Sequence, residues 1–392
     1  EGSGMFGTSV TVLPSGNIVV TDPLYDITTP SVIADVGAVY LYNGTTGALI
    51  STLTGGTAND TVGSEGITVL SNGNYVVASV NWDGTAADVG AVTWCSGITG
   101  CSGVVSSANS LVGSTVDDVV GAGGVTALTN GNYVVTSTNW SGTAALVGAV
   151  TWGDGTTGIT GLVSSANSLV GSTMSDFVGS NGVTALPNGN YVVDSTVWDG
   201  KASNVGAVTW CNGTAGTSGL VSSANSLVGS TEGDHVGLYG ITTLTNGNYV
   251  VNSPPWGGVG AITWGNATTG ISGLVSSANS LIGSTVNDLV GEDGVTALTN
   301  GNYVVRSLDW DGTAANVGAV TWGNGTTGTT GVVSSANSLV GSTANDQVGN
   351  SGVAALTNGN YVVASRNWNG TTVDVGAVTW GNGTTGITGS VS

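Results

Sequence analysis

The chain has 392 residues and a strongly acidic balance, with 23 acidic against 3 basic side chains and a formal net charge of −20. A nucleic-acid-binding protein needs Lys and Arg to neutralise phosphates, so this partner class is excluded, and an anionic membrane surface is disfavoured for the same reason. Hydrophobic residues make up 40% of the chain. They occur in short runs, which excludes both a disordered chain and a membrane-spanning helix.

One pattern, Gly-Asn-Tyr-Val-Val, returns along the whole chain and first appears as Gly16–Val20. Its asparagine is Asn17, Asn74, Asn132, Asn190, Asn248, Asn302 and Asn360. The intervals are 57, 58, 58, 58, 54 and 58 residues. Such a regular period indicates a repeat architecture, so we expect residues 1–392 to form a single domain of seven repeats.

The unit over residues 176–229 illustrates the strands that we expect in each repeat. Gly182–Leu186 is a short β-type run, and Asn188-Gly189 turns the chain into a second strand, Tyr191–Ser195. A connector leads to a third strand, Gly206–Trp210, and Leu220–Gly229 supplies a fourth, Ser-rich strand. Four short antiparallel strands in seven units predict an all-β, seven-bladed β-propeller. A β-solenoid is the alternative, although its rungs are usually shorter.

The first unit resembles the FG-GAP repeat of integrin α-type propellers. Phe6–Val10 matches the FG turn and innermost strand, Thr21–Pro23 matches the turn after the second strand, and Gly37–Tyr42 matches the third strand. The whole chain also resembles a bacterial surface-protein repeat of uncharacterised function, built on GAVTWGNGTTG and SSANSLVGS segments. These resemblances imply a propeller fold at the cell surface and are nearly silent about activity.

FG-GAP blades often carry a calcium loop of DxDxDG type between their first two strands, since Ca²⁺ takes six to eight oxygen ligands. The corresponding connection in this chain is only Ser71–Asn74, which has no carboxylate. We therefore expect no metal residues and no cofactor.

The twelve tryptophans occupy two positions of the repeat. One set ends the third strand and is expected to pack between blades: Trp94, Trp152, Trp210, Trp264, Trp322 and Trp380. The other set lies in the connector: Trp82, Trp140, Trp198, Trp256, Trp310 and Trp368, with Tyr25 in the first unit. Together with Asp83, Asp199 and Asp311, the connector set forms a candidate binding rim whose rings could stack on sugars. The interpretation that each ring plugs the gap between blades is favoured.

A recurring aspartate stands two residues before a Val-Gly pair, with one residue between them: Asp60, Asp118, Asp176, Asp234, Asp288 and Asp346. Aspartate at such a turn commonly accepts backbone N–H groups, so a structural capping role is favoured over ligand binding. Catalysis has little support, because His235 is the single histidine and no unit gains an acidic loop. We expect no catalytic residues and no enzyme activity.

The two ends of the chain together fall nine residues short of a full unit, and the missing part corresponds to the outer strand, Ser165–Thr173. Glu1–Gly4 is too short to replace it. The last blade should therefore present an unpaired edge, with Gly389, Ser390, Val391 and Ser392 as the candidate assembly edge. Such an edge can pair with another chain by β-augmentation.

Cys95 and Cys101 could form a disulfide across a turn, and three unpaired thiols, including Cys211, are the alternative. We expect an exported chain that has lost its signal. The predicted function is a non-enzymatic extracellular or cell-surface structural or adhesive protein. It would associate with itself, as a subunit of a filament or array, or with another surface protein. The alternative is a lectin-like or protein-binding head that uses the rim.

Overall fold

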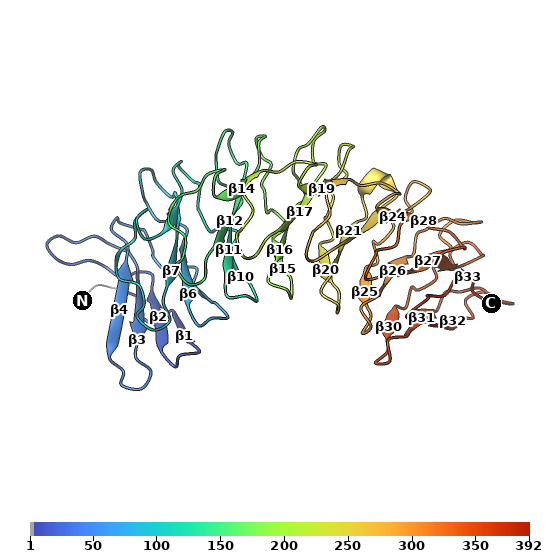
Figure 1. Cartoon of the computed structure of the whole chain (residues 1–392), viewed down its shortest axis with the longest axis horizontal. Helices are drawn as coiled ribbons and strands as arrows, with labels where there is room; N and C mark the ends of the chain where they lie inside the picture. Colours follow the sequence, from blue (N-terminus) through green and yellow to red (C-terminus); the bar gives the residue numbers. More distant parts are fainter. Residues whose placement is uncertain (1–3) are drawn as a thin grey trace. The chain divides into compact units, whose positions relative to one another are not determined.

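A computed structural model describes residues 4–392, so the expectation for Glu1–Gly4 falls largely outside the described residues. The chain divides into two compact units, Glu1–Val193 with Cys211–Val221, and Asp194–Trp210 with Ser222–Ser392. Each is described by itself. Figure 1 labels the strands in chain order. Within residues 4–392 the one helical element is a 3₁₀ turn, η1 (Trp256–Gly258), and no helix there is long and apolar enough to cross a membrane.

Each repeat contributes a first, second and third strand in the same order. The first strands are β1 (Ser9–Val12), β5 (Ile67–Val69), β10 (Val125–Ala127), β15 (Val183–Ala185), β20 (Ile241–Thr243), β25 (Val295–Ala297) and β30 (Val353–Ala355). The second strands are β2 (Ile18–Asp22), β6 (Tyr75–Ser79), β11 (Tyr133–Ser137), β16 (Tyr191–Ser195), β21 (Tyr249–Ser253), β26 (Tyr303–Ser307) and β31 (Tyr361–Ser365). The third strands are β3 (Ala38–Tyr42), β7 (Ala91–Cys95), β12 (Ala149–Gly153), β17 (Ala207–Cys211), β22 (Ala261–Gly265), β27 (Ala319–Gly323) and β32 (Ala377–Gly381). We number the blades 1 to 7 by these strands.

Blades 1 to 6 also have an outer strand, antiparallel to the third. The outer strands are β4 (Leu49–Thr54), β9 (Leu111–Val112), β14 (Ser168–Val170), β19 (Ser226–Val228), β24 (Ser280–Ile282) and β29 (Ser338–Val340). Blade 7 consists of β30, β31 and β32 alone. The number of blades, their antiparallel strands and the missing outer strand confirm the predicted class, an all-β seven-bladed propeller with an incomplete last blade.

In repeats 2 to 7, a two-residue strand that was not predicted from the sequence follows the third strand. We call it the bridging strand because it pairs in parallel with the outer strand of the preceding blade, as β8 does with β4. The bridging strands are β8 (Gly103–Val104), β13 (Gly161–Leu162), β18 (Gly219–Leu220), β23 (Gly273–Leu274), β28 (Gly331–Val332) and β33 (Gly389–Ser390). The single fourth strand predicted over Leu220–Gly229 was therefore wrong. Its first residue belongs to β18, and the outer strand β19 begins only at Ser226.

The Asn-Gly-Asn segment is the predicted hairpin between the first and second strands. In blade 2 the Leu70 N–H donates to the Asn74 carbonyl at 2.8 Å, which closes a loop of three residues. Gly73, the last of the three, has φ of +88°, a left-handed conformation that suits glycine. The turn therefore explains why glycine occurs at this point of every repeat.

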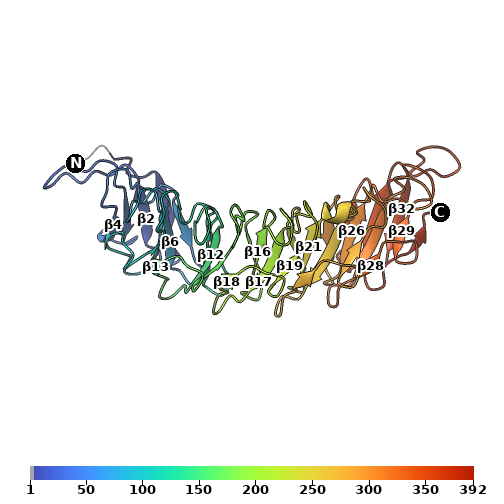
Figure 2. The ribbon, with the colours of Figure 1, turned by 90° about the horizontal axis from the view of Figure 1, so that it is seen from above.

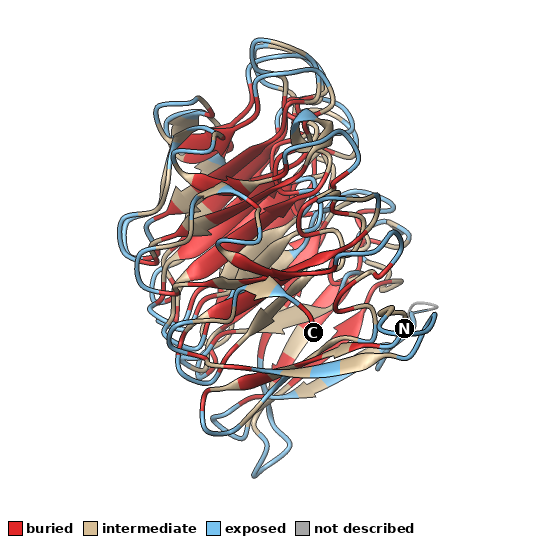
Figure 3. Ribbon diagram, turned by 90° about the vertical axis from the view of Figure 1, so that its right-hand side faces the viewer, coloured by how far each residue is buried: buried red, intermediate tan, exposed pale blue. Residues whose placement is uncertain are grey.

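The core consists of apolar side chains packed between consecutive blades. All five residues of β6, β11, β16 and β21 are buried, because both faces of these strands are covered. In the first unit one cluster joins Val19 and Leu41 of blade 1 to Tyr75 and Val77 of blade 2. In the second unit an equivalent cluster joins Val250 of blade 5 to Tyr303 of blade 6. The sheets that contain β21, β26 and β32 follow one another in that unit (Figure 2), and Figure 3 shows the buried residues along the strands and the exposed ones in the loops.

Candidate functional site

The connector aromatic residues of the predicted rim lie mostly inside the protein. Trp82, Trp140, Trp198 and Trp310 are at most 8% exposed, and Tyr25, Trp256 and Trp368 are partly buried. In blade 2 the Trp82 ring lies against Gly84, where an added Cβ would come within 2.7 Å of the ring. This burial agrees with the interpretation that each ring fills the gap between neighbouring blades. It leaves little of the ring faces free for stacking on a sugar.

The carboxylates of the predicted rim hold the connector loop in shape. The side chain of Asp83 accepts the N–H of Asp88 at 2.8 Å, and Asp199 and Asp311 accept the equivalent N–H groups at 2.7 Å. The residue held in this way has positive φ, 50° at Asp88, which a side chain adopts only at some energetic cost. These aspartates therefore stabilise the loop, whatever else they contact.

The recurring aspartate before Val-Gly is a buried cap, as the favoured interpretation predicted. In blade 1 the Asp60 Oδ2 accepts the N–H groups of Gly56 and Thr57, each at 2.7 Å. Its Oδ1 accepts the N–H of Asp83 from the connector of blade 2 at 2.9 Å. Burial raises the pKa of Asp60, and these three N–H donors oppose the rise. Equivalent pairs of bonds recur at Asp118, Asp234, Asp288 and Asp346.

A hydrogen-bonded lock that was not predicted from the sequence joins blades 2, 3, 5 and 6 to the blade that follows each of them. In blade 2 three donors converge on the Gly155 carbonyl of blade 3: Asn72 Nδ2 at 2.7 Å, Asn74 Nδ2 at 2.8 Å and Trp94 Nε1 at 2.9 Å. The same three positions donate to Gly213, Gly325 and Gly383 from blades 3, 5 and 6. The third-strand tryptophans therefore serve the blade interface, as predicted. The fixed spacing of Asn-Gly-Asn and tryptophan was the signal that could have revealed the lock.

Blade 7 leaves uncovered the face that every preceding blade buries. Val378 is 76% exposed and Trp380 is 53% exposed, whereas the residue equivalent to Val378 in blade 6, Val320, is fully buried. Among residues 4–392, no strand pairs with the outer side of the third strand β32. The free edge is thus β32 rather than the predicted Gly389–Ser392, because Gly389 and Ser390 form the bridging strand β33 and pair with Leu339 and Val340 of blade 6. Val391 is buried in the same interface.

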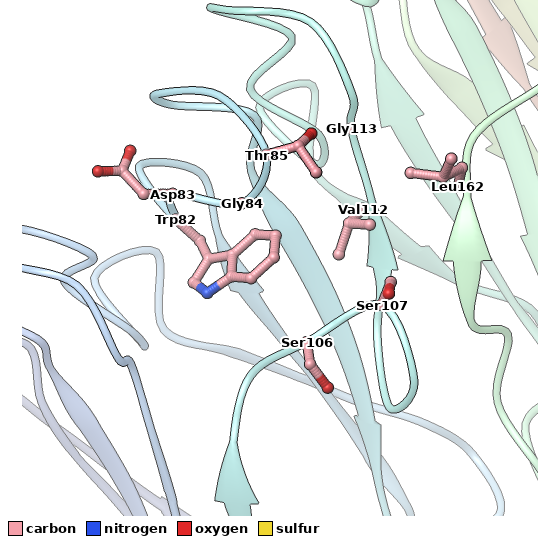
Figure 4. A pocket seen from close by; sticks show the side chains of 9 residues that line it. All are labelled: Trp82, Asp83, Gly84, Thr85, Ser106, Ser107, Val112, Gly113 and Leu162. Atoms are coloured by element: carbon pink, nitrogen blue, oxygen red, sulfur yellow. The ribbon is translucent and has the colours of Figure 1, made fainter.

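A small open cavity lies beside the connector in blade 2 (Figure 4). It has a volume of about 380 Å³ and is lined by Trp82, Thr85, Ser106, Val112 and Leu162, among others. The benzene edge of the Trp82 indole faces Val112, while the ring nitrogen and the Asp83 carboxylate point away (Figure 4). An equivalent cavity of about 310 Å³ recurs in blade 6 beside Trp310.

The other residues singled out in the sequence, Cys95, Cys101 and His235, form contacts that stabilise the fold. Cys95 and Cys101 form a disulfide across the turn that follows β7. His235 Nδ1 lies 2.9 Å from the Thr196 carbonyl oxygen, and its neighbour Asp234 is one of the caps. Among residues 4–392, no three His, Cys, Asp or Glu side chains gather as metal ligands would.

Cys211 is the cysteine of the described chain that forms no disulfide, and it is fully buried beside Tyr191. Burial raises the pKa of its thiol to about 12, so we expect it to remain protonated and inaccessible at mildly alkaline pH. A thiol-reactive chromogenic reagent should detect no thiol in the native protein and one per chain after denaturation. Rapid reaction of the native protein would contradict the burial.

Comparison with known proteins places the repeats in a family. The model of a family described as "Repeat of unknown function (DUF5650)" matches residues 12–64, 69–122, 127–180, 185–238, 243–292, 297–350 and 355–392. These seven matches follow the seven repeats counted from the asparagines. No curated protein matches the sequence.

Three solved structures have a low similarity to this chain. The Dos1 propeller is 10% identical, with a TM-score of 0.37, over 99% of this chain and 81% of that one. The C-terminal WD40 domain of Sif2 is 12% identical, with a TM-score of 0.31, over 94% of this chain and 80% of that one. Hsv2 of Kluyveromyces lactis is 10% identical, with a TM-score of 0.32, over 95% and 98%. At these scores the likenesses add nothing to the blade structure argued above from the strands.

Proposed function

Because the chain belongs to the family of repeats of unknown function DUF5650, whose description states no activity, we propose a function from the blades themselves. The protein is a non-enzymatic structural or adhesive protein that acts by protein–protein association. Its association surface, which we call the terminal face, consists of Val362, Val378 and Trp380 with the free edge of β32. Asp60 and its equivalents cap turns, Asp83, Asp199 and Asp311 hold the connector loops, and His235 lies against the Thr196 carbonyl oxygen.

The terminal face is the single observation that carries this proposal. Val362 and Val378 are equivalent to side chains that other blades bury completely, such as Val304 and Val320 in blade 6, and the blade 6 equivalent of Trp380, Trp322, is partly buried. Burial of one valine side chain is worth about 1.5–3 kcal/mol, so an uncovered face with an exposed tryptophan beside an unpaired strand favours a partner. Tryptophan is also enriched among the residues that contribute most to interfaces.

An extracellular or cell-surface location is part of the proposal. The Cys95–Cys101 disulfide supports it, since disulfides persist in oxidising compartments. The resemblance to FG-GAP and bacterial surface repeats supports it as well. In blade 1, Gly7 has φ of +89° and turns the chain before β1, where the FG-GAP pattern has its turn. The Gly37–Tyr42 segment contains β3, where the pattern has its third strand.

Sedimentation velocity of the purified chain at rising concentration tests the association. We expect larger species to form in the wild type and Val378→Asp to suppress them, because the variant puts a charge on the terminal face. Val286→Asp is the matched control, since Val286 is 65% exposed but lies in a loop. A wild type that stays monomeric at all concentrations would contradict the proposal.

Saccharide binding is a second candidate function, favoured by the cavities beside Trp82 and Trp310. Each combines an indole edge and a valine with serine and threonine hydroxyls, which is a lining that suits the C–H and O–H groups of a sugar. We expect a glycan array to detect a ligand that Leu162→Arg, at the cavity mouth of blade 2, weakens and that Leu238→Arg does not. An array without binding, or binding indifferent to Leu162→Arg, removes this candidate.

A further inference from the structure

The turn that follows the third strand carries an Asn-X-Thr triplet in five of the seven repeats. Such a triplet is the acceptor motif for N-linked glycans, in which a sugar is attached to the asparagine side-chain nitrogen. The asparagines are Asn43, Asn212, Asn266, Asn324 and Asn382. The hydrogen bonds of the turn show which part of the triplet the fold needs and which part it does not.

The turn needs an acceptor atom at the asparagine position. In blade 6 the Asn324 Oδ1 accepts the N–H groups of Thr326 and Thr327 at 2.8 and 3.1 Å. Blade 3 has Asp154 at this position, and its carboxylate accepts the equivalent N–H groups at 2.7 and 3.0 Å. Blade 2 has Ser96, whose hydroxyl accepts them at 3.2 Å. Asp, Ser and Asn all supply the acceptor, so the turn makes no use of the asparagine nitrogen.

The threonine of the triplet is not needed by the turn either, since blade 2 has Ile98 in its place. The threonine hydroxyls and the asparagine side-chain nitrogens of the five triplets form no hydrogen bond within residues 4–392, and all ten side chains are exposed or partly exposed. These threonines are Thr45, Thr214, Thr268, Thr326 and Thr384. The two groups that define a glycan acceptor are therefore both open to solvent.

Three other Asn-X-Ser or Asn-X-Thr triplets use one of these groups in the fold. At residues 59–61 the threonine hydroxyl accepts the side-chain amide of Asn81 at 3.1 Å. At residues 139–141 the serine hydroxyl accepts a backbone N–H at 3.2 Å. At residues 369–371 the asparagine nitrogen donates to Asp346 at 2.9 Å. An available amide and an available hydroxyl thus occur together in the third-strand turn and not in these three places.

We propose that the asparagines of these five turns are N-glycosylation sites. The side-chain nitrogen forms a bond to the anomeric carbon of a lipid-linked glycosyl diphosphate, the bond from that carbon to the diphosphate oxygen breaks, and the amide releases one proton. In blade 6 the lock holds the adjacent Gly325 carbonyl. The modified nitrogen takes no part in the lock, so the glycan leaves it intact. This inference goes beyond the proposed association and shares only its extracellular location.

The few basic residues of the chain provide a direct test. Cleavage by trypsin after Arg306 and Arg366 releases residues 307–366, in which Asn324 begins the sole Asn-X-Ser or Asn-X-Thr triplet. In protein purified from its native source, mass spectrometry of this peptide should show added saccharide mass that fragmentation locates on Asn324. The blade 3 turn, with Asp154, should carry none. An unmodified 307–366 peptide would overturn the proposal.

Two variants copy turns that the chain already contains and should therefore fold normally. Asn324→Asp reproduces the blade 3 turn, and Thr326→Ile reproduces the isoleucine of blade 2. Produced in the same source, each should abolish the addition on residues 307–366, whereas Thr326→Ser should retain it. An addition that survives Thr326→Ile is not made through the triplet and overturns the inference. These variants leave the terminal face unchanged, so sedimentation tests the proposed function independently of the glycan.

Discussion

Raising the pH from about 9 to about 12 is expected to unfold the chain cooperatively, since buried tyrosines must then ionise. Burial raises the pKa of Tyr303 from 10.0 to about 12, and it also raises the pKa of Tyr75, Tyr133, Tyr191 and Tyr361. The unfolded chain loses these protons near pH 10, whereas the folded chain retains them. Stability is therefore fully present below pH 10 and is lost as the pH rises toward the folded pKa. For Tyr303 the shift corresponds to roughly 3 kcal/mol.

Several such residues together would remove a free energy comparable with the whole stability of a domain, which is about 5–15 kcal/mol. Tyrosinate absorbance and far-ultraviolet circular dichroism, recorded on the same samples, should change together between pH 10 and 12. Tyr303→Phe should move the transition to higher pH, and Tyr239→Phe, at a half-exposed ring, should leave it in place. Ionisation near pH 10 without loss of structure would show that the rings are not buried.

Asp288→Ala is expected to destabilise the chain by about 3 kcal/mol or more, because the carboxylate has no replacement for its N–H donors. Ser284 and Thr285 donate to Oδ2 at 2.6 and 2.8 Å, and Asp311 donates to Oδ1 at 2.9 Å. A buried donor left without an acceptor costs about 1–3 kcal/mol. Denaturation in urea, with hydrogen exchange of the 284–311 segment, measures the loss.

The matched variant is Asp311→Ala. The native Asp311 side chain accepts a single N–H, from Asn316 at 2.7 Å. It should cost about 1 kcal/mol. Equal effects of the two variants would mean that the buried cap contributes no more than a surface loop contact.

The sequence predicted the parts of the fold that depend on local chemistry. Asn-Gly-Asn specifies a hairpin because glycine tolerates positive φ, and the Tyr-Val-Val runs specify buried strands. It did not reveal the bridging strands, because two residues such as Gly219-Leu220 carry no periodicity of their own and pair only with a strand from another repeat. For the same reason the free edge was predicted at Gly389–Ser392, although these residues complete the sheet of blade 6 and leave β32 exposed.

In the candidate site, too, local contacts could be predicted from the sequence and contacts between repeats could not. The capping role of Asp60 and its equivalents could be predicted from their position in a turn. The convergence of Asn72, Asn74 and Trp94 on one carbonyl could not, because the acceptor is a backbone atom 61 to 83 residues further along the chain and has no residue type of its own. The sequence does not distinguish the two roles of the connector tryptophans, because filling a gap between blades and stacking on a sugar both require an indole ring.

The bridging strand also bears on how such a gene can change in length. The bridging strand of one repeat pairs with the outer strand of the blade before it, as β13 pairs with β9 and β28 pairs with β24. Duplication or loss of one whole unit in frame therefore restores every junction with the same partners, and no new contact has to evolve. Loss of a bridging strand alone would leave the outer strand of the preceding blade without that partner. The regular spacing of the seven repeats is compatible with this exchange.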